Sequence, residues 1–309
     1  MTRRQFAHLL AGFGAYLTLP GMARLHGQDR RMRVAVSAET LAGANINDAR
    51  AAYRVWGEEL QRGLGITRTD LVPDVFIPSE QMIQMIRAAT IDCFVLTAWE
   101  YAKVADVLDT DWVLVEDYVA DGLEYLLVVH NASSFKTIED LRGSRFTVHH
   151  HRDTVLLSAW VSLLLASSGQ GPMENFFSST ISRDNMTQVV LPVFFHRADA
   201  AGLTRRAFDV AAEMNPQLGR DLRILAVSPK LIPIVFCFRR GCRTEDVQQF
   251  KDAVVKFKTL TAGQQVLQIY QSSGFTPKHG SSMKPTLDLV RQYERLEART
   301  RAAARKERF

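Results

Sequence analysis

The sequence predicts an α/β protein built from two lobes. Short apolar segments alternate with helical segments along the chain, which is typical of a mainly parallel sheet covered by helices. The same pattern restarts after residue 130, and no Pro-, Ser- or Gly-rich linker separates the two halves. With 309 residues, 47% of them hydrophobic, the chain is long enough for two domains that each bury a core. We therefore expect two lobes, each a mixed, mainly parallel sheet flanked by helices.

The first half of the chain supplies the elements of the first lobe. A helix is expected where apolar residues recur at helical spacing, and strands where short apolar runs end in polar residues or proline. Ser79 follows Pro78 and is a suitable cap for the second helix. The predicted strands are 33–37, 74–77, 91–96, 112–117 and 125–129, and the predicted helices are 47–63, 79–86 and 99–107.

The second lobe begins with a one-turn helix at 138–143, a strand at 145–148 and a strongly apolar helix at 154–167. Segments 188–193, 198–203 and 222–227 add further strands and helices, followed by a strand at 234–238 and an amphipathic helix at 246–260. Crossovers are expected near residues 130 and 229. The predicted division is a first lobe of 31–130 plus 229–285, a second lobe of 131–228, and a charged C-terminal helix at 286–309.

The N-terminus has the pattern of an export signal. The pair Arg3-Arg4 precedes an apolar run at 7–19 that contains no charged residue, and small residues follow at 21–23. A paired arginine before a short apolar run is typical of a twin-arginine signal, which is removed after export. We predict that residues 1–28 are this signal and that the protein is periplasmic. The alternative interpretation is a buried N-terminal helix.

Composition and motifs argue against several other classes. The net charge is +5, but the excess of positive charge lies in the two terminal segments rather than on a folded face with interleaved aromatics. A nucleic-acid or membrane binder that uses the basic tail is therefore the weaker alternative. No nucleophile elbow, Walker loop, dinucleotide glycine motif or metalloprotease histidine pair is present in the sequence. We expect a monomeric protein that is not an enzyme and needs no cofactor.

Several segments, in the same order along the chain, resemble the bacterial phosphonate/phosphate/phosphite-type (PhnD-like) substrate-binding proteins of ABC transporters. The most specific runs from the strand at 126–129 through residues 130–143, and is similar to a signature of type II periplasmic binding proteins. The other matching segments are 34–40, 91–96, 198–201, 228–229 and 274–277. The resemblance implies a two-lobed type II periplasmic binding protein with its ligand in a cleft between the lobes.

The resemblance also implies a role. A small oxyanion would be enclosed by hinge closure and delivered to an ABC permease in the inner membrane. The alternative is a periplasmic sensor that presents an oxyanion such as a phosphonate or arsenite to a membrane histidine kinase. Arsenite binding would give Cys93 a role as a soft ligand, whereas a free cysteine in an apolar strand is usually a buried core thiol. Cys237 and Cys242 are close enough in sequence for a disulfide, and this possibility remains open.

Family site residues can be carried over position by position. A Ser-Thr-Ser run that cradles the oxyanion falls on Asp153, Thr154 and Val155, so only the threonine is retained. A family tyrosine falls on Glu80. A family histidine falls near Arg183 and Asp184, and an acidic position falls near Thr204 and Arg205. Either arginine would supply charge-assisted contacts to an oxyanion.

Residues after the predicted strands complete the candidate site, because strand ends face the cleft in this fold. Of the three histidines at 149–151, at most two are expected to face one site, since successive side chains on an extended chain alternate. Hydrogen bonding to the ligand by His151 is preferred to metal ligation, and no metal is predicted. Trp99 and Tyr101 either wall the pocket or pack in the core. The predicted set is Ser37, Glu39, Thr40, Glu80, Thr97, Trp99, Tyr101, His151, Asp153, Thr154, Arg183, Asp184, Thr204 and Arg205.

Overall fold

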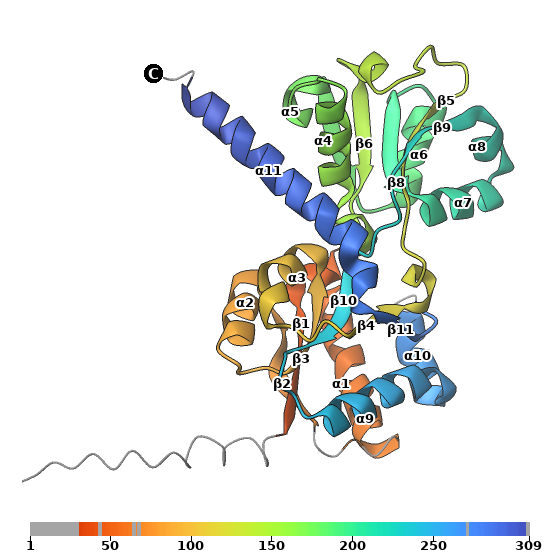
Figure 1. The fold of residues 1–309 in the computed structure, drawn as a ribbon. Helices are drawn as coiled ribbons and strands as arrows, with labels where there is room; N and C mark the ends of the chain where they lie inside the picture. The colour runs from red at the N-terminus through yellow and green to blue at the C-terminus, as the bar shows by residue number, and fades with distance from the viewer. Residues whose placement is uncertain (1–30, 43–44, 64–65, 67–68, 270–271, 307–309) are drawn as a thin grey trace, which may run out of the picture. The chain divides into compact units, whose positions relative to one another are not determined.

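Two β-sheets, each covered by helices on both faces, organise the chain in a computed structural model (Figure 1). The model describes residues 31–42, 45–63, 66, 69–269 and 272–306. The predicted signal at 1–28 lies outside these residues. The mixed two-sheet α/β architecture predicted from the sequence is confirmed. We call the six-stranded sheet with its helices the first lobe, and the five-stranded sheet with its helices the second lobe.

The first lobe is built on a mixed sheet. Strand β1 pairs in parallel with β2 and β3, whereas β10 pairs antiparallel with β3 and β4, and β11 antiparallel with β4. The order across the sheet is β11-β4-β10-β3-β1-β2. The strands are β1 Met32–Ser37, β2 Thr69–Ile77, β3 Cys93–Thr97, β4 Trp112–Glu116, β10 Ile234–Phe238 and β11 Phe275–His279.

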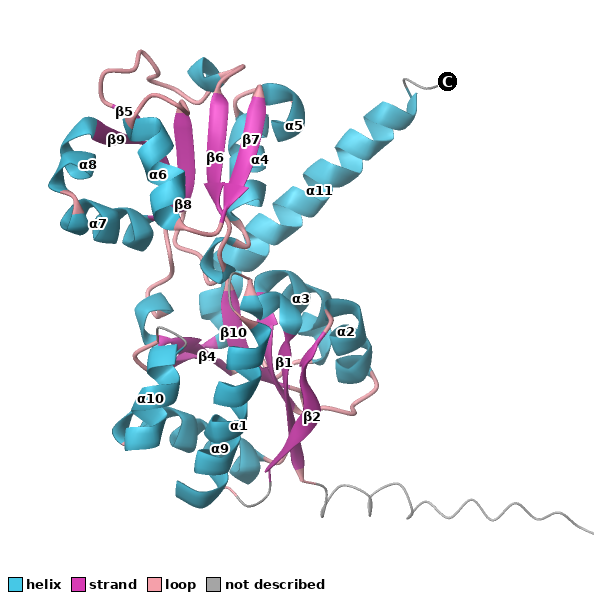
Figure 2. Ribbon diagram, turned by 180° about the vertical axis from the view of Figure 1, so that it is seen from behind, coloured by secondary structure: helices cyan, strands magenta, loops and turns pink. Residues whose placement is uncertain are grey.

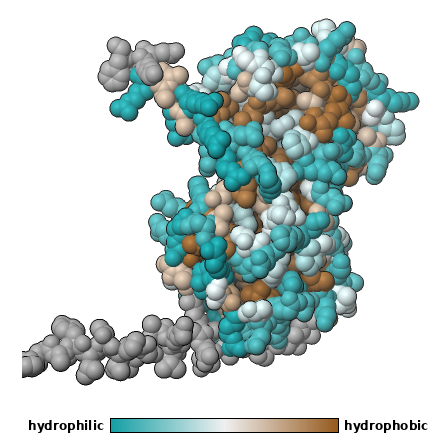
Figure 3. All heavy atoms as spheres, viewed as in Figure 1, coloured by the Kyte–Doolittle hydropathy of each residue, from teal (hydrophilic) through white to brown (hydrophobic). Residues whose placement is uncertain are grey.

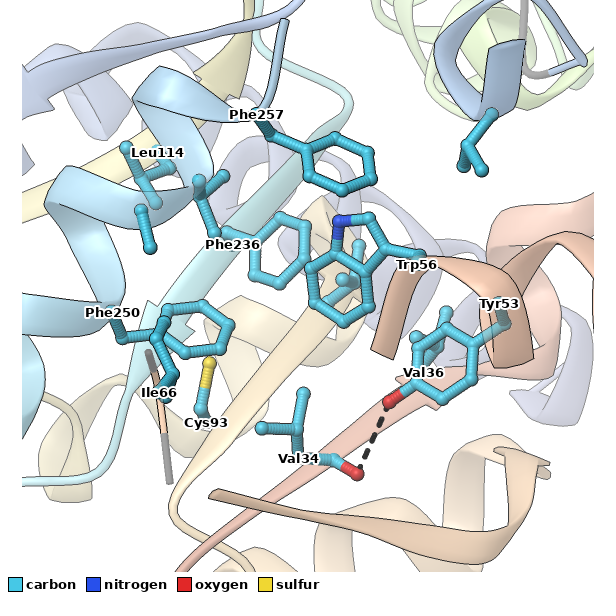
Figure 4. Packing of buried hydrophobic residues seen from close by; sticks show 14 of the residues in the cluster. Val34, Val36, Tyr53, Trp56, Ile66, Cys93, Leu114, Phe236, Phe250 and Phe257 are labelled. Carbon is cyan, nitrogen blue, oxygen red and sulfur yellow. Dashed lines mark hydrogen bonds between the residues drawn. The ribbon is translucent and has the colours of Figure 1, made fainter. Parts of the chain in front are cut away.

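Helices cover both faces of this sheet (Figure 2). One face packs against α1 (Ile46–Gly63), α9 (Thr244–Lys256) and α10 (Thr261–Ile269), and the other against α2 (Ser79–Arg87) and α3 (Ala98–Val104). On the first of these faces, the Trp56 ring lies about 6 Å from the rings of Phe236, Phe250 and Phe257 (Figure 4). Burial of these large aromatic side chains is the main apolar contribution to this core.

The second lobe has the strand order β7-β6-β8-β5-β9. Strand β6 is parallel to β7 and β8, and β5 is antiparallel to β8 and β9. The strands are β5 Tyr125–His130, β6 Arg145–His149, β7 Ser179–Arg183, β8 Ala200–Thr204 and β9 Leu222–Val227. Helices α4 (Leu157–Ser167) and α5 (Met173–Phe176) cover one face, and α6 (Met186–Phe194), α7 (Arg205–Met214) and α8 (Pro216–Asp221) cover the other.

Strand pairing corrects the boundary predicted near residue 130. The segment 125–130 was assigned to the first lobe, but β5 pairs with β8 and β9 and therefore belongs to the second sheet. The chain crosses between Glu116 and Tyr125 and returns between Val227 and Ile234. Strand β7 was not predicted, because it is an edge strand whose exposed, mostly polar residues give no apolar pattern. Segment 188–193 forms part of α6.

The C-terminal helix α11 (Lys284–Lys306) packs against both α3 and α4, and its residues Leu289 and Val290 are buried in the second lobe's core. Figure 3 shows mainly hydrophilic residues along the visible side of this helix. Among the described helices, none is both long enough and apolar enough to cross a membrane.

None of the three cysteines forms a disulfide in the described part of the chain. The possible disulfide between Cys237 and Cys242 is therefore not formed, and the Cys237 thiol lies near the Phe94 carbonyl oxygen instead. Cys93 is fully buried, as expected for a core thiol, and burial raises its pKa well above the usual value.

Candidate functional site

A cavity of about 410 Å³ lies where segments that follow strands of both sheets meet. We call it the cleft cavity. Its first-lobe wall lies at the ends of β1, β2 and β3, and its second-lobe wall at the ends of β6 and β7. The lining residues are Glu39, Ala42, Ser79, Thr97, Trp99 and Glu100 from the first lobe, and Val148, His149, His150, His151, Thr154, Val155, Ser158 and Ser182 from the second.

A buried carboxylate organises the first-lobe wall. Glu100 is only 1% exposed, and its Oε2 accepts hydrogen bonds from the backbone N–H and the hydroxyl of Thr97, both at 2.9 Å. Its Oε1 accepts from the Ser37 hydroxyl at 2.5 Å. Glu100 therefore ties the ends of β1 and β3 together as the partner of a capping box at the start of α3. Sequence analysis missed this residue, although the Thr97-x-x-Glu100 spacing is the signature of such a cap.

The second-lobe wall is formed mainly by a tight turn at residues 149–154, which we call the histidine turn. Strand β6 ends at His149, and the Thr154 hydroxyl donates to the His149 carbonyl oxygen at 2.7 Å while accepting from the His151 N–H at 3.0 Å. The rings of His149 and His151 stack, with centroids 5.3 Å apart. Asp184 Oδ1 lies 2.7 Å from His150 Nδ1.

All three histidines, of which at most two were expected to face one site, are among the residues that line the cavity. The alternation of side chains applies only while the chain is extended, and here the chain turns directly after His149.

Two histidines of this turn, His149 and His151, favour their neutral forms. Burial lowers the pKa of His149 below 6.5, and the neighbouring His151 lowers it further. Burial is also the main cause of the lowered pKa of His151, which Asp153 partly opposes. His149 Nε2 lies 3.3 Å from the Asp184 carbonyl oxygen, whereas Nδ1 is buried and has no partner among the described residues. With its proton on Nε2, neutral His149 presents Nδ1 as a vacant acceptor.

Trp99 forms part of the wall and also joins the two lobes. Its indole N–H donates to the Val155 carbonyl oxygen at 2.9 Å, and its ring packs edge-on against Tyr293 of α11. Tyr101, the other aromatic candidate, is a core residue that is 2% exposed, and burial raises its pKa to about 12. Tyr101 is therefore not in the cavity.

Five of the predicted residues line the cavity: Glu39, Thr97, Trp99, His151 and Thr154. Two others lie just behind the first-lobe wall. Ser37 is fully buried and contacts Glu100, while Thr40 is buried and donates to the Ser37 carbonyl oxygen. Glu80 is exposed on α2, next to the lining residue Ser79.

The remaining second-lobe candidates already have structural partners. Asp153 accepts a hydrogen bond from the Tyr118 hydroxyl at 2.9 Å, and Thr204 caps α7 by accepting from the Ala207 N–H. Arg205 forms an ion pair with Glu124. None of the three lines the cavity.

Arg183 and Asp184 lie just beyond the cavity rim. The Arg183 guanidinium is exposed and donates to the Ser182 carbonyl oxygen, while the Asp184 carboxylate contacts the His150 ring. The lining of the cleft cavity, as far as the structure describes it, contains no lysine or arginine. Arg183 and Arg205, which were expected to supply positive charge to the site, both lie outside this cavity. Among all the residues that the structure describes, no group of three or more His, Cys, Asp or Glu side chains is arranged to hold a metal ion.

Solved structures share this fold at low sequence identity. The binding-protein component of an ABC phosphonate transporter from Pseudomonas aeruginosa is 16% identical, with a TM-score of 0.53 and 89% of each chain covered. PhnD1 from Prochlorococcus marinus in complex with methylphosphonate is 12% identical, with a TM-score of 0.57 over 86% of this chain and 99% of the other. A Xanthomonas citri protein bound to ATP is 17% identical, with a TM-score of 0.56 over 86% and 98% of the two chains.

Curated protein sequences give no match to the chain. A family model does match: residues 44–282 fit the model described as ABC transporter, phosphonate, periplasmic substrate-binding protein. The match spans most of both lobes, including both walls of the cleft cavity from Ser79 onward. Members of this family bind substrates for transport and are not enzymes, in agreement with the prediction from the sequence. The chain belongs to the family of periplasmic substrate-binding proteins of phosphonate ABC transporters.

Proposed function

We propose that the protein binds a small oxyanion of the phosphonate, phosphite or phosphate type in the cleft cavity and delivers it to an ABC permease. The observation that carries the proposal is the chemistry of the lining. Hydroxyl groups from both lobes and imidazoles from the second lobe converge on one space of about 410 Å³, which is large enough for such a ligand.

The cavity offers neutral hydrogen-bond donors rather than fixed cations. The hydroxyls of Ser79, Ser158 and Ser182 line it and form no hydrogen bond with any other described side chain or backbone group. Ser158 lies in the first turn of α4, where backbone N–H groups lack intrahelical partners and the helix dipole favours an anion. These groups can replace the hydration shell of an oxyanion without a paired charge.

The carboxylates of the wall select the charge of the ligand. Glu39 and Glu100 both line the cavity, so a doubly charged anion is repelled more than a singly charged one. A singly protonated oxyanion also carries a hydroxyl that can donate to the vacant Nδ1 of His149. The preferred ligand on this basis is a monoanion that bears one P–OH group.

Isothermal titration of the chain lacking residues 1–28 with methylphosphonate, phosphite, phosphate and an alkylsulfonate tests the proposal. Replacing Ser158 by Ala should weaken binding about 10-fold or more, since a hydrogen bond to a charged group contributes about 1.5–3 kcal/mol. Ser167→Ala is the matched control, because Ser167 lies on the same helix but outside the cavity. Absence of binding heat with every oxyanion would rule out the proposed ligand class. Equal affinity in the Ser158→Ala and Ser167→Ala variants would show that the ligand binds outside the cleft cavity.

The cellular role follows from the family and from the N-terminal sequence. We propose export of a monomer through a twin-arginine signal at residues 1–28, followed by docking to an inner-membrane permease. The alternative partner is a membrane histidine kinase that reads the loaded protein. Co-purification of the ligand-loaded chain with either membrane protein separates the two roles, and sedimentation at micromolar concentration tests the monomer.

A further inference from the structure

A second cavity lies in the apolar core of the first lobe. We call it the core cavity; it has a volume of about 90 Å³. Aliphatic and aromatic side chains of β1, α1, β4, β10 and α10 line it, and several of them are seen in Figure 4. They include Val36, Tyr53, Trp56, Leu114, Phe236 and Val266. Protein interiors are normally packed without voids larger than a water molecule, so a cavity of this size in an otherwise aromatic core requires an explanation.

The mouth of the core cavity is polar. Glu116 at the end of β4 and Arg152 in the turn after β6 both line it and form an ion pair. Their side chains are only 9% and 16% exposed, respectively. Glu116 Oε2 and Arg152 Nε are buried, and neither has a hydrogen-bond partner in the described part of the chain. Buried polar atoms normally have partners, so one acceptor and one donor are unsatisfied at the same opening.

The core cavity is separate from the cleft cavity, although the short 3₁₀ helix Ala38–Leu41 borders both. Within this helix and the residue after it, Thr40 and Leu41 line the core cavity, whereas Glu39 and Ala42 line the cleft cavity. The linings differ in chemistry as well as in position. One is apolar with a single ion pair, and the other is rich in hydroxyls and histidines.

We propose that the core cavity is a binding site for a short-chain alcohol of about three to five carbons. One hydroxyl satisfies both unpaired atoms, because it donates to Glu116 Oε2 and accepts from the Arg152 Nε–H. The alkyl group then lies among Val36, Trp56 and Phe236. A cavity of about 90 Å³ is smaller than the ~150 Å³ apolar cavities that accept benzene, which limits the alkyl group to this length.

The ion pair argues for an uncharged ligand. Glu116 and Arg152 already neutralise each other, so a carboxylate or an ammonium group would introduce an unpaired charge into a buried site. A hydrocarbon would fill the apolar part but leave both polar atoms unsatisfied. A single water would satisfy the polar atoms but leave the apolar part empty.

The test titrates the full folded chain with isobutanol (2-methylpropan-1-ol) and follows methyl resonances by NMR. The expected result is a saturable shift of the Val36, Leu114 and Val266 methyls, with no shift of Val189 or Leu203 in the second lobe's core. Xenon provides the matched apolar probe. Shifts absent with both probes, or equally large in both lobes with isobutanol, would overturn the proposal.

Two variants separate the roles of the hydroxyl and of the space. Glu116→Leu combined with Arg152→Met removes both unsatisfied atoms together, and should weaken isobutanol binding at least 10-fold while xenon still enters. Val266→Phe fills the cavity and should abolish the binding of both isobutanol and xenon, while leaving methylphosphonate binding unchanged. Unaltered isobutanol affinity in the double variant would overturn the hydroxyl's role. A crystal structure grown with isobutanol that shows only a water bridging Glu116 and Arg152 would overturn the alcohol site itself.

Discussion

The buried pair Glu116–Arg152 joins the two lobes, and removing one partner should be far more damaging than removing both. Burial alone disfavours the charged Arg152 guanidinium, but Glu116 and its neighbours hold the pKa of Arg152 above its usual value, so the arginine remains charged. Arg152→Met leaves the Glu116 carboxylate buried without its cation. Glu116→Leu leaves the Arg152 guanidinium buried without its carboxylate partner. The double variant leaves neither charge, and places apolar side chains at the mouth of an apolar cavity.

The expected magnitudes follow from burial. Breaking a buried pair by removing one partner typically costs about 3–5 kcal/mol, whereas replacing the whole pair by apolar residues of similar volume is often neutral. For domains of this size, one kcal/mol corresponds to about 2–4 °C in Tm. Each single variant should therefore melt roughly 6–20 °C below the parent, while the double variant should recover most of the loss.

Urea unfolding of the four proteins gives the coupling free energy of the pair as a double-mutant cycle. The exposed pair Arg87–Asp106 is the matched control, since its side chains are 47% and 64% exposed. Exposed pairs couple by at most about 1 kcal/mol. Coupling between Glu116 and Arg152 no larger than that of the control, or a double variant as unstable as the sum of the singles, would refute the argument.

Three further predictions concern the second lobe. Because burial lowers the pKa of His149 below 6.5, the unfolded chain takes up a proton at higher pH than the folded one. The free energy of unfolding should thus fall as the pH drops below 6.5, and His149→Gln should reduce that decline between pH 7.5 and 5.5 in urea titrations. Thr154→Val removes the hydroxyl that fixes the histidine turn, so it should cost about 1–2 kcal/mol in urea and weaken oxyanion binding in calorimetry; unchanged binding would remove Thr154 from the site. Gly202→Ala would place a Cβ 2.8 Å from Phe146 Cζ and should cost about 1–3 kcal/mol, whereas Gly171→Ala, in open space, should be close to neutral by thermal melting.

The fold was predictable because its signal is local. The mostly apolar run at 91–96 and the alternating segment at 145–148 both indicate strands, and the helices between the strands repeat at the right period. The position of β5 was not predictable in this way. Its residues Tyr125–Val129 are buried on both faces of the sheet, so their pattern fits a central strand of either lobe. The lobe to which β5 belongs is decided only by its pairing with β8 and β9, and this pairing joins residues that lie far apart in the sequence.

Two predicted residues that line the cavity show what kinds of signal the sequence carries. Thr97 was predicted from its place at the end of a strand, and Thr154 from the match to the family motif. The places of Arg183 and Arg205 outside this cavity were not predictable, because the sequence does not reveal their surroundings. Arg205 is held by Glu124, which lies 81 residues earlier in the chain, and Arg183 lies at the end of an edge strand that no apolar pattern indicated. Charge on a candidate residue is informative only when its neighbours in space are known.

One short segment connects ligand binding with the contacts between the lobes. Residues 151–155 supply His151 and Thr154 to the cleft cavity, and the same segment carries three contacts to the first lobe. Arg152 pairs with Glu116, Asp153 accepts from Tyr118, and Val155 accepts from Trp99. A ligand that repositions the histidine turn must therefore change all three contacts at once. Affinity for the oxyanion should consequently depend on Tyr118, which touches neither ligand: Tyr118→Phe loses one of the three contacts and should shift affinity in calorimetry, whereas unchanged affinity would show that the segment moves independently of the lobes.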